Sequence, residues 1–348
     1  MQLSFQEMYD AIGTKNPAFE GMFITGVKST GIFCRPSCRA RKPLAKNVEF
    51  FRSSEEALKA GYRPCKICRP MDHDPDTPQE IRDLIKRLHN EPQVRIRDQD
   101  LRDLLYDPVS VRRWFNKHHN MTFQCYQRLI RLNAGYREIE DGQSVLNTAL
   151  DAGFESLSGF SERYSSVFGS SPRSKNKKSI IHVHRFSGKL GSMFIAATQK
   201  GICLLEFTER KMLETEFDDL RKRCHAVLMP GTNEHIEQLK KELEEYFAGE
   251  RICFQVKLDL VGTDFQKQVW NCLLNIPYGE TISYKQQALS MGRGEAVRAV
   301  ARANGMNKVA IVVPCHRVIG SDGNLTGYAG GLPRKRWLLD LEASNTTH

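Results

Sequence analysis

The sequence contains no run of about 18 apolar residues, the length that a membrane-spanning helix needs. Its first residues, Met1–Asp10, also lack a cationic segment followed by an apolar one, which is the pattern of a secretory signal. We therefore expect no contact with a membrane and no export. Without export, the ten cysteines should stay reduced, which favours metal binding or catalysis over disulfides.

Acidic residues are outnumbered by basic ones. The chain has 51 lysines and arginines against 41 aspartates and glutamates, a net charge of +10. Such an excess indicates a polyanionic partner, most often nucleic acid, although charge alone shows only that the surface attracts anions. The length of 348 residues suits two or three domains, and a charged content of 26% is that of an ordinary globular protein.

Four cysteines near the N-terminus form two closely spaced pairs. Cys34 and Cys38 make a C-x3-C pattern, and Cys65 and Cys68 make a C-x2-C pattern. Two such pairs predict a tetrahedral four-thiolate site for one zinc ion, which is purely structural in most proteins. A basic cluster adjoins the first pair and fits either phosphate contacts or a solvated face: Arg35, Arg39, Arg41, Lys42. Asp72, His73 and Asp74 lie in a polar, proline-containing linker, and we interpret them as solvated.

Helical periodicity dominates residues 79 to about 173. Apolar residues at helical spacing predict an amphipathic helix around Leu84–Leu88, a second around Leu101–Leu105, and a third after Pro108 with Val111, Trp114 and Phe115 facing a core. The pattern returns with Val145, Leu146, Ala149 and Leu150, a turn at Gly153, and then Leu157, Phe160, Tyr164 and Phe168. A basic helix after a short turn is typical of helix-turn-helix units, although a plain helical bundle is the alternative. A basic linker follows at 174–179.

The remaining half mixes strands and helices. Apolar runs predict strands at Met193–Ala197 and Gly201–Phe207, and helices near Ile236–Ala248 and from Phe265 to Leu274. A further helix should open at Glu280-Thr281, and Arg298 and Arg302 should share one face of the next.

Cys315 and His316 follow a strongly apolar stretch. The β-branched run Val309–Val313 predicts a buried strand, which Pro314 should end because proline cannot donate to a sheet. A cysteine and a histidine at such a kink form a candidate nucleophile with its base, although a buried structural cysteine is the alternative. Five other cysteines have no paired spacing, and we interpret them as structural: Cys125, Cys203, Cys224, Cys253, Cys272.

Several ordered motifs resemble the O6-alkylguanine-DNA alkyltransferases. They are Val313–Val318, Glu280–Tyr284, Glu295–Val300 and Gly327–Gly331, within residues 263 to about 342. The resemblance implies an α+β alkyltransferase, with a ribonuclease-H-like subdomain at 180–262 and a catalytic domain with a winged-helix-like DNA-binding core at 263–348. Ala329 stands where some members have serine, which puts one contact to the base in doubt.

The same resemblance implies roles for individual residues. Cys315 would take a methyl group in a Cys–water–His–Glu chain with His316 and Glu342. The damaged base would be flipped out of the duplex, and the contacts to DNA would come from Arg298 in the vacated gap, Tyr284 at the 3′ phosphate, Asn307 at the active-site turn and Tyr328 at the guanine.

The other two regions also resemble known families. Phe23–Cys34 and the residues around both cysteine pairs resemble the zinc domain of the Ada family, an α+β domain at 1–72 in which the residue matching Cys34 takes a methyl group from a DNA phosphotriester. Residues 79–174 resemble the all-α AraC-type domain with two helix-turn-helix units. That resemblance implies base readout from Arg112, Arg113, Asn116, Ser158 and Arg163.

The order of the three regions therefore predicts a bifunctional repair protein and regulator of the Ada family. We expect a cytoplasmic, nucleoid-associated monomer that binds zinc, methylated double-stranded DNA and promoter DNA, with RNA polymerase as a partner implied by the resemblance. Three alternatives remain: a pure transcription factor, a cysteine hydrolase using the Cys-His-Glu trio, and a redox sensor built on the four-cysteine cluster.

Overall fold

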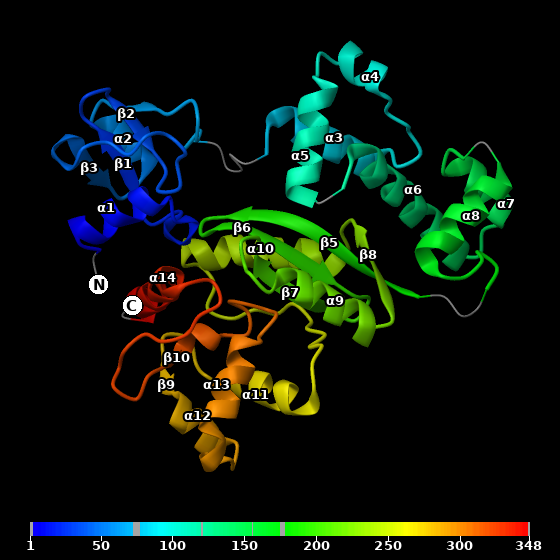
Figure 1. Ribbon diagram of the computed structural model, residues 1–348. Helices are drawn as coiled ribbons and strands as arrows, with labels where there is room; N and C mark the ends of the chain where they lie inside the picture. Colours follow the sequence, from blue (N-terminus) through cyan, green and yellow to red (C-terminus); the bar gives the residue numbers. More distant parts are fainter. Residues whose placement is uncertain (1–2, 72–76, 120, 155, 175–177, 347–348) are drawn as a thin grey trace. The chain divides into compact units, whose positions relative to one another are not determined.

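The structure is a computed structural model that describes residues 3–71, 77–119, 121–154, 156–174 and 178–346 (Figure 1). The chain forms two compact units, one of residues 1–76, 185–216 and 234–348, the other of residues 77–184 and 217–233. Asp72, His73 and Asp74 of the predicted linker lie outside the described residues, as do residues 175–177 of the second linker. Within the described ranges, no helix is long and apolar enough to cross a membrane.

A four-stranded sheet forms the centre of the first 71 residues. Its strand order is β3-β1-β2-β4, with β1 at Ile24–Val27, β2 at Ile32–Cys34, β3 at Val48–Phe51 and β4 at Arg63–Pro64. Helices α1 (Phe5–Thr14) and α2 (Ser54–Lys59) and the 3-10 turns Pro17–Phe19 and Ala45–Asn47 complete the domain. Strands β2 and β4 are parallel, so their carboxyl ends meet at the same edge of the sheet.

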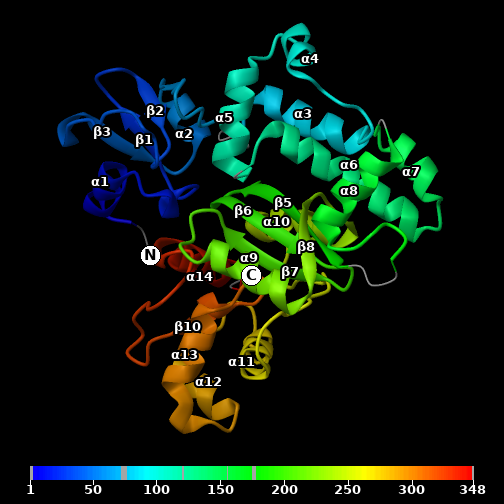
Figure 2. The same ribbon diagram turned by 45° about the vertical axis from the view of Figure 1, so that its right-hand side comes forward.

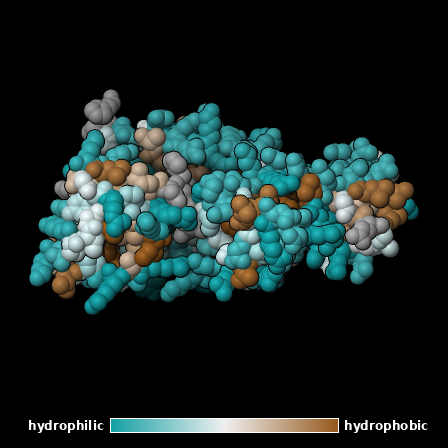
Figure 3. Space-filling view, turned by 90° about the horizontal axis from the view of Figure 1, so that it is seen from above, coloured by the Kyte–Doolittle hydropathy of each residue, from teal (hydrophilic) through white to brown (hydrophobic). Residues whose placement is uncertain are grey.

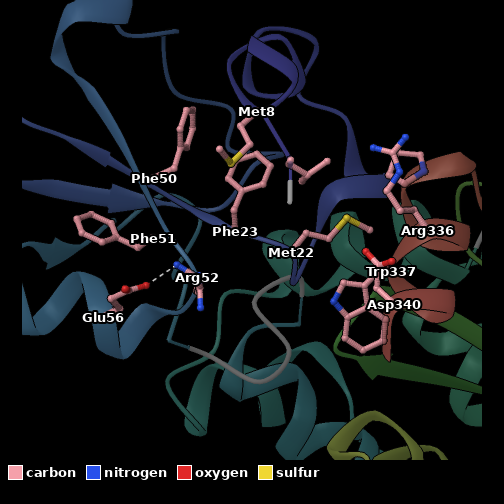
Figure 4. A pocket seen from close by; sticks show the side chains of 12 residues that line it. Met8, Met22, Phe23, Phe50, Phe51, Arg52, Glu56, Arg336, Trp337 and Asp340 are labelled. Atoms are coloured by element: carbon pink, nitrogen blue, oxygen red, sulfur yellow. Dashed lines mark hydrogen bonds between the residues drawn. The ribbon is translucent and has the colours of Figure 1, made fainter. Parts of the chain in front are cut away.

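Apolar side chains hold α1 and α2 against this sheet. Phe23 and Val48 pack with Ala11 and Ile12 of α1. Figure 4 shows Met8 of α1 close to Phe23, and the hydrogen bond in which the backbone N–H of Arg52 donates to Glu56 at 2.6 Å. This bond satisfies a donor at the start of α2.

Six helices form the middle domain: α3 (Gln79–Asn90), α4 (Asp98–Asp103), α5 (Pro108–His119), α6 (Phe123–Glu140), α7 (Val145–Asp151) and α8 (Leu157–Phe168). Pro108 occupies the first turn of α5, and the Asp107 carboxylate accepts from the N–H groups of Val109 and Ser110. Gly153 adopts φ +69° in the turn before α8, as its position predicted. The two predicted helix-turn-helix units and the helix α6 that joins them are confirmed.

Four leucines of this domain contradict the predicted core. Leu104 and Leu105 were expected on the face of a helix, but α4 ends at Asp103, and Leu105 has φ +61° and is 93% exposed. Leu146 and Leu150 are on α7 but point to solvent. The α7 helix has only seven residues, and Ala149 and Thr148 occupy its buried face.

A second four-stranded sheet has the order β7-β6-β5-β8. Its strands are β5 (Ser179–Gly188), β6 (Gly191–Ala197), β7 (Ile202–Phe207) and β8 (Ala226–Pro230). Strands β6 and β7 are antiparallel, every residue of β7 is buried, and α10 (Glu234–Ala248) lies on β6. The predicted strands and the predicted helix near 236–248 are confirmed, whereas β5, β8 and helix α9 (Leu213–Arg223) were not predicted.

Short elements make up the C-terminal part. They are α11 (Asp264–Leu274), β9 (Ile282–Ser283), α12 (Tyr284–Ser290), a 3-10 turn (Gly294–Ala296), α13 (Val297–Gly305), a 3-10 turn (Cys315–Arg317), β10 (Val318–Ile319) and α14 (Leu332–Thr346). Figures 1 and 2 show α11, α12 and α13 together in both views. The helix expected to open at Glu280 begins instead at Tyr284, because Ser283 caps it and exchanges hydrogen bonds with Gln286.

The predicted strand Val309–Val313 is wrong. All five residues are buried, but only Val309 forms a bridge, to Leu205 of β7, and the rest is a turn. Ile311 has φ +70°, a left-handed conformation that strains a β-branched residue. The run thus has the composition of a strand but forms a turn just before Cys315.

Figure 3 shows the hydropathy of one face of the molecule. The face shown in Figure 3 is mostly hydrophilic, and its hydrophobic residues lie in small separate groups.

Candidate functional site

The four N-terminal cysteines converge. Their sulfur atoms all lie within 4.8 Å of one another. Parallel pairing of β2 with β4 causes this, since Cys34 ends β2, Cys65 follows β4, and the N–H of Cys65 donates to the carbonyl of Phe33 at 3.0 Å. Four converging sulfurs match the donor set and size of a tetrahedral zinc site, in which each Zn–S bond is about 2.3 Å.

Crowding perturbs these thiols. The hydrogen bonds that the Cys34 thiol donates to Cys38 and Cys68, together with burial, raise the pKa of Cys34, whereas the hydrogen bonds that Cys38 accepts from Cys34 and Cys68 lower the pKa of Cys38 to about 2. Four sulfurs in such a small volume therefore cannot all ionise unless a cation neutralises them. A bound zinc ion supplies this charge and keeps the sulfurs as thiolates.

Glu20 supports the first cysteine pair, and sequence reasoning missed it. Its buried carboxylate accepts hydrogen bonds from the N–H of Ser37 at 3.1 Å and from the Ser37 hydroxyl, within the loop between Cys34 and Cys38. It also pairs with Arg35 at 3.5 Å. Glu20 and Ser37 are 17 residues apart, so no local spacing could have shown the contact.

The basic residues beside this site divide into two kinds. Arg35 is held by Glu20, while Arg39 is exposed. The ammonium group of Lys42 lies 3.7 Å from the ring centroid of Tyr9, which is a cation–π contact. Of the three arginines, Arg39 and Arg41 are exposed and therefore remain more accessible to a DNA phosphate than Arg35.

The second cysteine site brings three predicted residues together. The Nε2–H group of His316 donates to Oε1 of the Glu342 carboxylate at 2.8 Å, and both side chains are fully buried. Cys315 precedes His316 in a 3-10 turn and is 8% exposed. The other ring nitrogen of His316, Nδ1, is buried and has no hydrogen-bond partner among the described residues, which leaves it available for a water-bridged link to Cys315.

Asn307 fixes the turn that carries Cys315. Its Nδ2 donates to the carbonyl of Val313 at 2.9 Å and to Sγ of Cys315 at 3.3 Å, and its Oδ1 accepts from the N–H of Val309 at 3.0 Å. One buried amide therefore holds both ends of the turn and reaches the sulfur of Cys315.

The ionisation states of this site follow from burial. Burial raises the pKa of Cys315, and hydrogen bonding from Asn307 partly opposes this. Burial also lowers the pKa of His316, more than Glu342 raises it, so the imidazole is neutral at pH 7 and can accept a proton. Burial disfavours the charged form of Glu342, but hydrogen bonds and charges from His316 and Arg317 outweigh it and lower the pKa of Glu342 to about 2. Because His316 is neutral, we assign the stabilising charge to Arg317.

Three further groups donate hydrogen bonds to the Glu342 carboxylate. None of them was assigned to the site from the sequence. Arg317 donates to both oxygens at 2.9 Å, the N–H of Gly279 donates at 3.1 Å, and the hydroxyl of Tyr246 donates at 2.6 Å. Arg317 belongs to the motif that carries Cys315, so its neighbourhood offered a signal. Tyr246 and Gly279 offered none.

Three of the predicted DNA contacts of this half lie on α12, on α13 and on the loop before α14. Arg298 and Arg302 are exposed on α13, together with Ala299. The Tyr284 hydroxyl lies 3.4 Å from the carbonyl of Thr326. Tyr328 has a buried hydroxyl with no hydrogen-bond partner among the described residues, and its ring lies 6.5 Å from that of His316. The loop that carries Tyr328 thus adjoins His316.

The middle domain presents its predicted residues outward. Arg112, Arg113 and Asn116 are exposed on α5, and Ser158 and Arg163 are exposed on α8. Arg112 pairs with Asp98 at 3.1 Å. Their roles in reading bases stay predictions.

Four family sequence models match the chain. They are the metal binding domain of Ada at residues 7–71, a helix-turn-helix domain at 102–178, the ribonuclease-like domain of 6-O-methylguanine DNA methyltransferase at 181–260, and its DNA binding domain at 264–344. Along the chain, the matches run from the zinc domain through the helix-turn-helix domain to the two parts of the alkyltransferase, which is the order that the sequence predicted.

Whole proteins match as well. The bifunctional transcriptional activator/DNA repair enzyme Ada of Escherichia coli is 33% identical over 99% of this chain and 98% of its own length. The regulatory protein ada of Salmonella typhimurium is 32% identical over 97% and 96%. A methylated-DNA–protein-cysteine methyltransferase of Mycobacterium bovis is 47% identical over 47% of this chain and 94% of its own length.

A zinc domain, a helix-turn-helix domain and a cysteine alkyltransferase in one chain define a DNA repair methyltransferase that is also a transcriptional activator. The similarity along almost the entire chain makes the assignment specific. This chain belongs to the Ada family.

Proposed function

We propose that the protein removes methyl groups from O6-methylguanine, and from O4-methylthymine, onto Cys315. The contact that supports this best is the 2.8 Å link between His316 and Glu342 beside the buried Cys315. The neutral imidazole takes the thiol proton through a bridging water, and the thiolate attacks the methyl carbon. An S–C bond forms, the O6–C bond breaks, and the departing guanine takes up a proton, so the proton count balances.

The base must leave the duplex to reach Cys315, since its methyl group lies within the stacked helix. We assign Arg298 to the gap left in the duplex, Tyr284 to the 3′ phosphate and Tyr328 to the guanine. The exposed α13 supports the first role, and the buried, unpaired hydroxyl of Tyr328 in the described chain supports the third. The product is a stable thioether, so Cys315 reacts once.

We propose a second transfer at Cys34, from a methylphosphotriester of DNA. The Cys34 sulfur attacks the methyl carbon, and the phosphodiester leaves as a stable anion. Methylation turns a thiolate into a neutral thioether and halves the net negative charge of four thiolates with one zinc dication. Repulsion between this site and DNA phosphates falls, so affinity for the promoter rises and the methylated protein activates transcription. Activation of transcription requires RNA polymerase as a partner. A monomer of the protein that is associated with the nucleoid is sufficient for this activation.

The test is the intact mass of the zinc-loaded protein after incubation with methylated duplex DNA, followed by peptide mapping. Two added methyl groups, on Cys34 and Cys315, support both reactions. A methyl group on Cys315 alone would contradict the proposed affinity switch at Cys34 and would indicate that the zinc site is purely structural. If no mass is added, both proposed methyl transfers are contradicted.

A second experiment addresses the switch. Promoter affinity is measured with methylated and unmethylated protein over a range of salt concentrations. We expect tighter binding after methylation, with the difference shrinking as salt rises. Equal affinity and equal salt dependence would contradict the charge mechanism.

A further inference from the structure

An arginine-lined pocket lies in the middle domain, and none of its described lining residues belongs to either cysteine site. It has a volume of about 380 Å³ and lies where α6, the loop before α4 and the start of α8 meet. Four arginines line it, together with polar and small residues: Arg95, Arg128, Arg131, Arg163, Gln124, Gly153, Ser156, Gly159. None of the described residues that line it is acidic.

The arginines are held close together by buried hydrogen bonds. The side-chain amide of Gln127, on α6, accepts from the N–H of Ile96 at 3.0 Å and donates to its carbonyl at 2.8 Å. This pairing fixes the loop that carries Arg95 against α6. On the opposite side, Arg131 donates to the carbonyl of Gly153 at 3.1 Å, and its guanidinium lies 5.0 Å from the ring centroid of Phe154.

Arg131 is a buried cation in this pocket. It is only 8% exposed, and its Nε is buried without a hydrogen-bond partner among the described residues. Burial, followed by repulsion from Arg95 and Arg128, lowers its pKa. Neither Arg128 nor Arg163 forms a hydrogen bond or ion pair with the part of the chain that the structure describes. Positive charges gathered in this way are stabilised when an anion enters.

The helix beside the pocket adds a second attraction for an anion. Ser156 caps α8, a helix of 12 residues, and Gly159 lies in its first turn. Both line the pocket, so the positive end of the helix dipole borders the arginines, although the Gly159 N–H itself donates to Oγ of Ser156 at 3.1 Å. Guanidinium groups and a helix N-terminus are together the usual partners of a phosphate group.

We propose that this pocket binds a backbone phosphate of duplex DNA and thereby anchors the domain between its two helix-turn-helix units. The proposal rests on the DNA-binding role assigned above and adds a contact that carries no sequence information. It also changes the role expected for Arg163, which lines the pocket: that residue should hold a phosphate and not read a base.

The test compares variants of the full zinc-loaded chain on two duplexes, a promoter and an unrelated sequence, over a range of salt concentrations. Arg128→Gln should weaken binding to both duplexes by the same factor and reduce the slope of log Kd against log salt by about 1. Arg163→Gln should do the same. Arg87→Gln is the matched control, since it removes one charge from α3 outside the pocket, where Arg87 pairs with Glu91.

Each outcome decides the proposal. An unchanged salt slope in Arg128→Gln, or a loss confined to the promoter, would overturn it. Wild-type protein that binds neither duplex would instead overturn the proposed DNA-binding function. Arg128→Lys keeps the charge and should preserve the salt slope, which separates loss of a phosphate contact from loss of folding.

Inorganic phosphate distinguishes a backbone phosphate from a free anion. It is titrated without DNA while the Nε–H signal of Arg131 is followed by NMR. Saturation by free phosphate, with no change in DNA binding by Arg128→Gln, would make the pocket a small-anion site and contradict the proposal. Displacement of bound phosphate by the unrelated duplex would support it.

Discussion

Tyr246 on α10 donates a 2.6 Å hydrogen bond to Oε1 of Glu342, a residue 96 positions later on α14. Both side chains are fully buried. The same oxygen contacts His316 at 2.8 Å, so Tyr246 competes with the imidazole for the carboxylate. The subdomain that contains α10 therefore contributes to the electrostatics around His316 and Cys315.

Replacing Tyr246 with phenylalanine tests this competition. With one donor removed, Oε1 attracts the imidazole proton more strongly, so the pKa of His316 rises. We expect the acid limb of the pH–rate profile for methyl transfer to Cys315 to move to higher pH, and the free energy of unfolding to fall by about 1.5–3 kcal/mol. Tyr278→Phe is the control, because its hydroxyl accepts from Asn345 and does not bind Glu342. Lower stability with an unmoved profile would leave Tyr246 purely structural.

Acid should destabilise the alkyltransferase through Glu342. Its folded-state pKa of about 2 lies below the ordinary 4.5, so its contribution to stability is complete above pH 4.5 and is lost as the pH falls toward 2. A shift of this size corresponds to about 3 kcal/mol. Urea unfolding at several pH values, followed by tryptophan fluorescence in a Trp114→Phe background, measures it.

Glu342→Gln is the matched comparison for this acid dependence. The variant should be less stable at pH 7 by about 3–5 kcal/mol, since Arg317 keeps its charge in a buried position without a counter-ion. Its stability should also change less between pH 4.5 and 2. Parallel pH profiles for the two proteins would contradict the role given to Glu342.

Local spacing predicted much of this structure. The four zinc-site cysteines lie in two close pairs, and the β2–β4 pairing only had to bring the pairs together. The cores of α5 and α8 repeat at helical spacing, so Trp114, Phe115 and Phe160 were predicted from periodicity alone. Such features depend on residues a few positions apart.

The misjudged features depend on distant or non-periodic contacts. The run at Val309–Val313 bends because the side chain of Asn307 accepts a hydrogen bond from the N–H of Val309 and donates one to the carbonyl of Val313. In a strand, these two backbone groups would form hydrogen bonds with a neighbouring strand instead. Nothing in the amino-acid composition of this run predicts the φ of +70° at Ile311. Glu20 and Tyr246 are likewise linked to their sites only through the folded chain.

Removal of one thiolate should release zinc. Cys65→Ser is expected to lower the zinc content from one ion per chain to none, because a structural site needs four ligands and serine is a poor one. Hydrogen exchange of the β2–β4 region should rise, since the metal holds these two strand ends together. Cys253→Ser is the control, as Cys253 is exposed and away from the four converging sulfurs. Full zinc content in Cys65→Ser would contradict the four-thiolate site.

Arg298 should affect the rate of repair only when the damaged base lies in a duplex. Replacing an extruded base offsets part of an unstacking cost of a few kcal/mol, so Arg298→Ala should slow repair of duplex O6-methylguanine by roughly 10- to 100-fold. Single-stranded substrate needs no replacement and should react nearly normally. Arg302→Ala, one turn along α13 and equally exposed, loses the same charge and serves as control. Equal slowing on both substrates would place Arg298 in general phosphate binding, because a residue that fills a gap in a duplex has no such gap in a single strand.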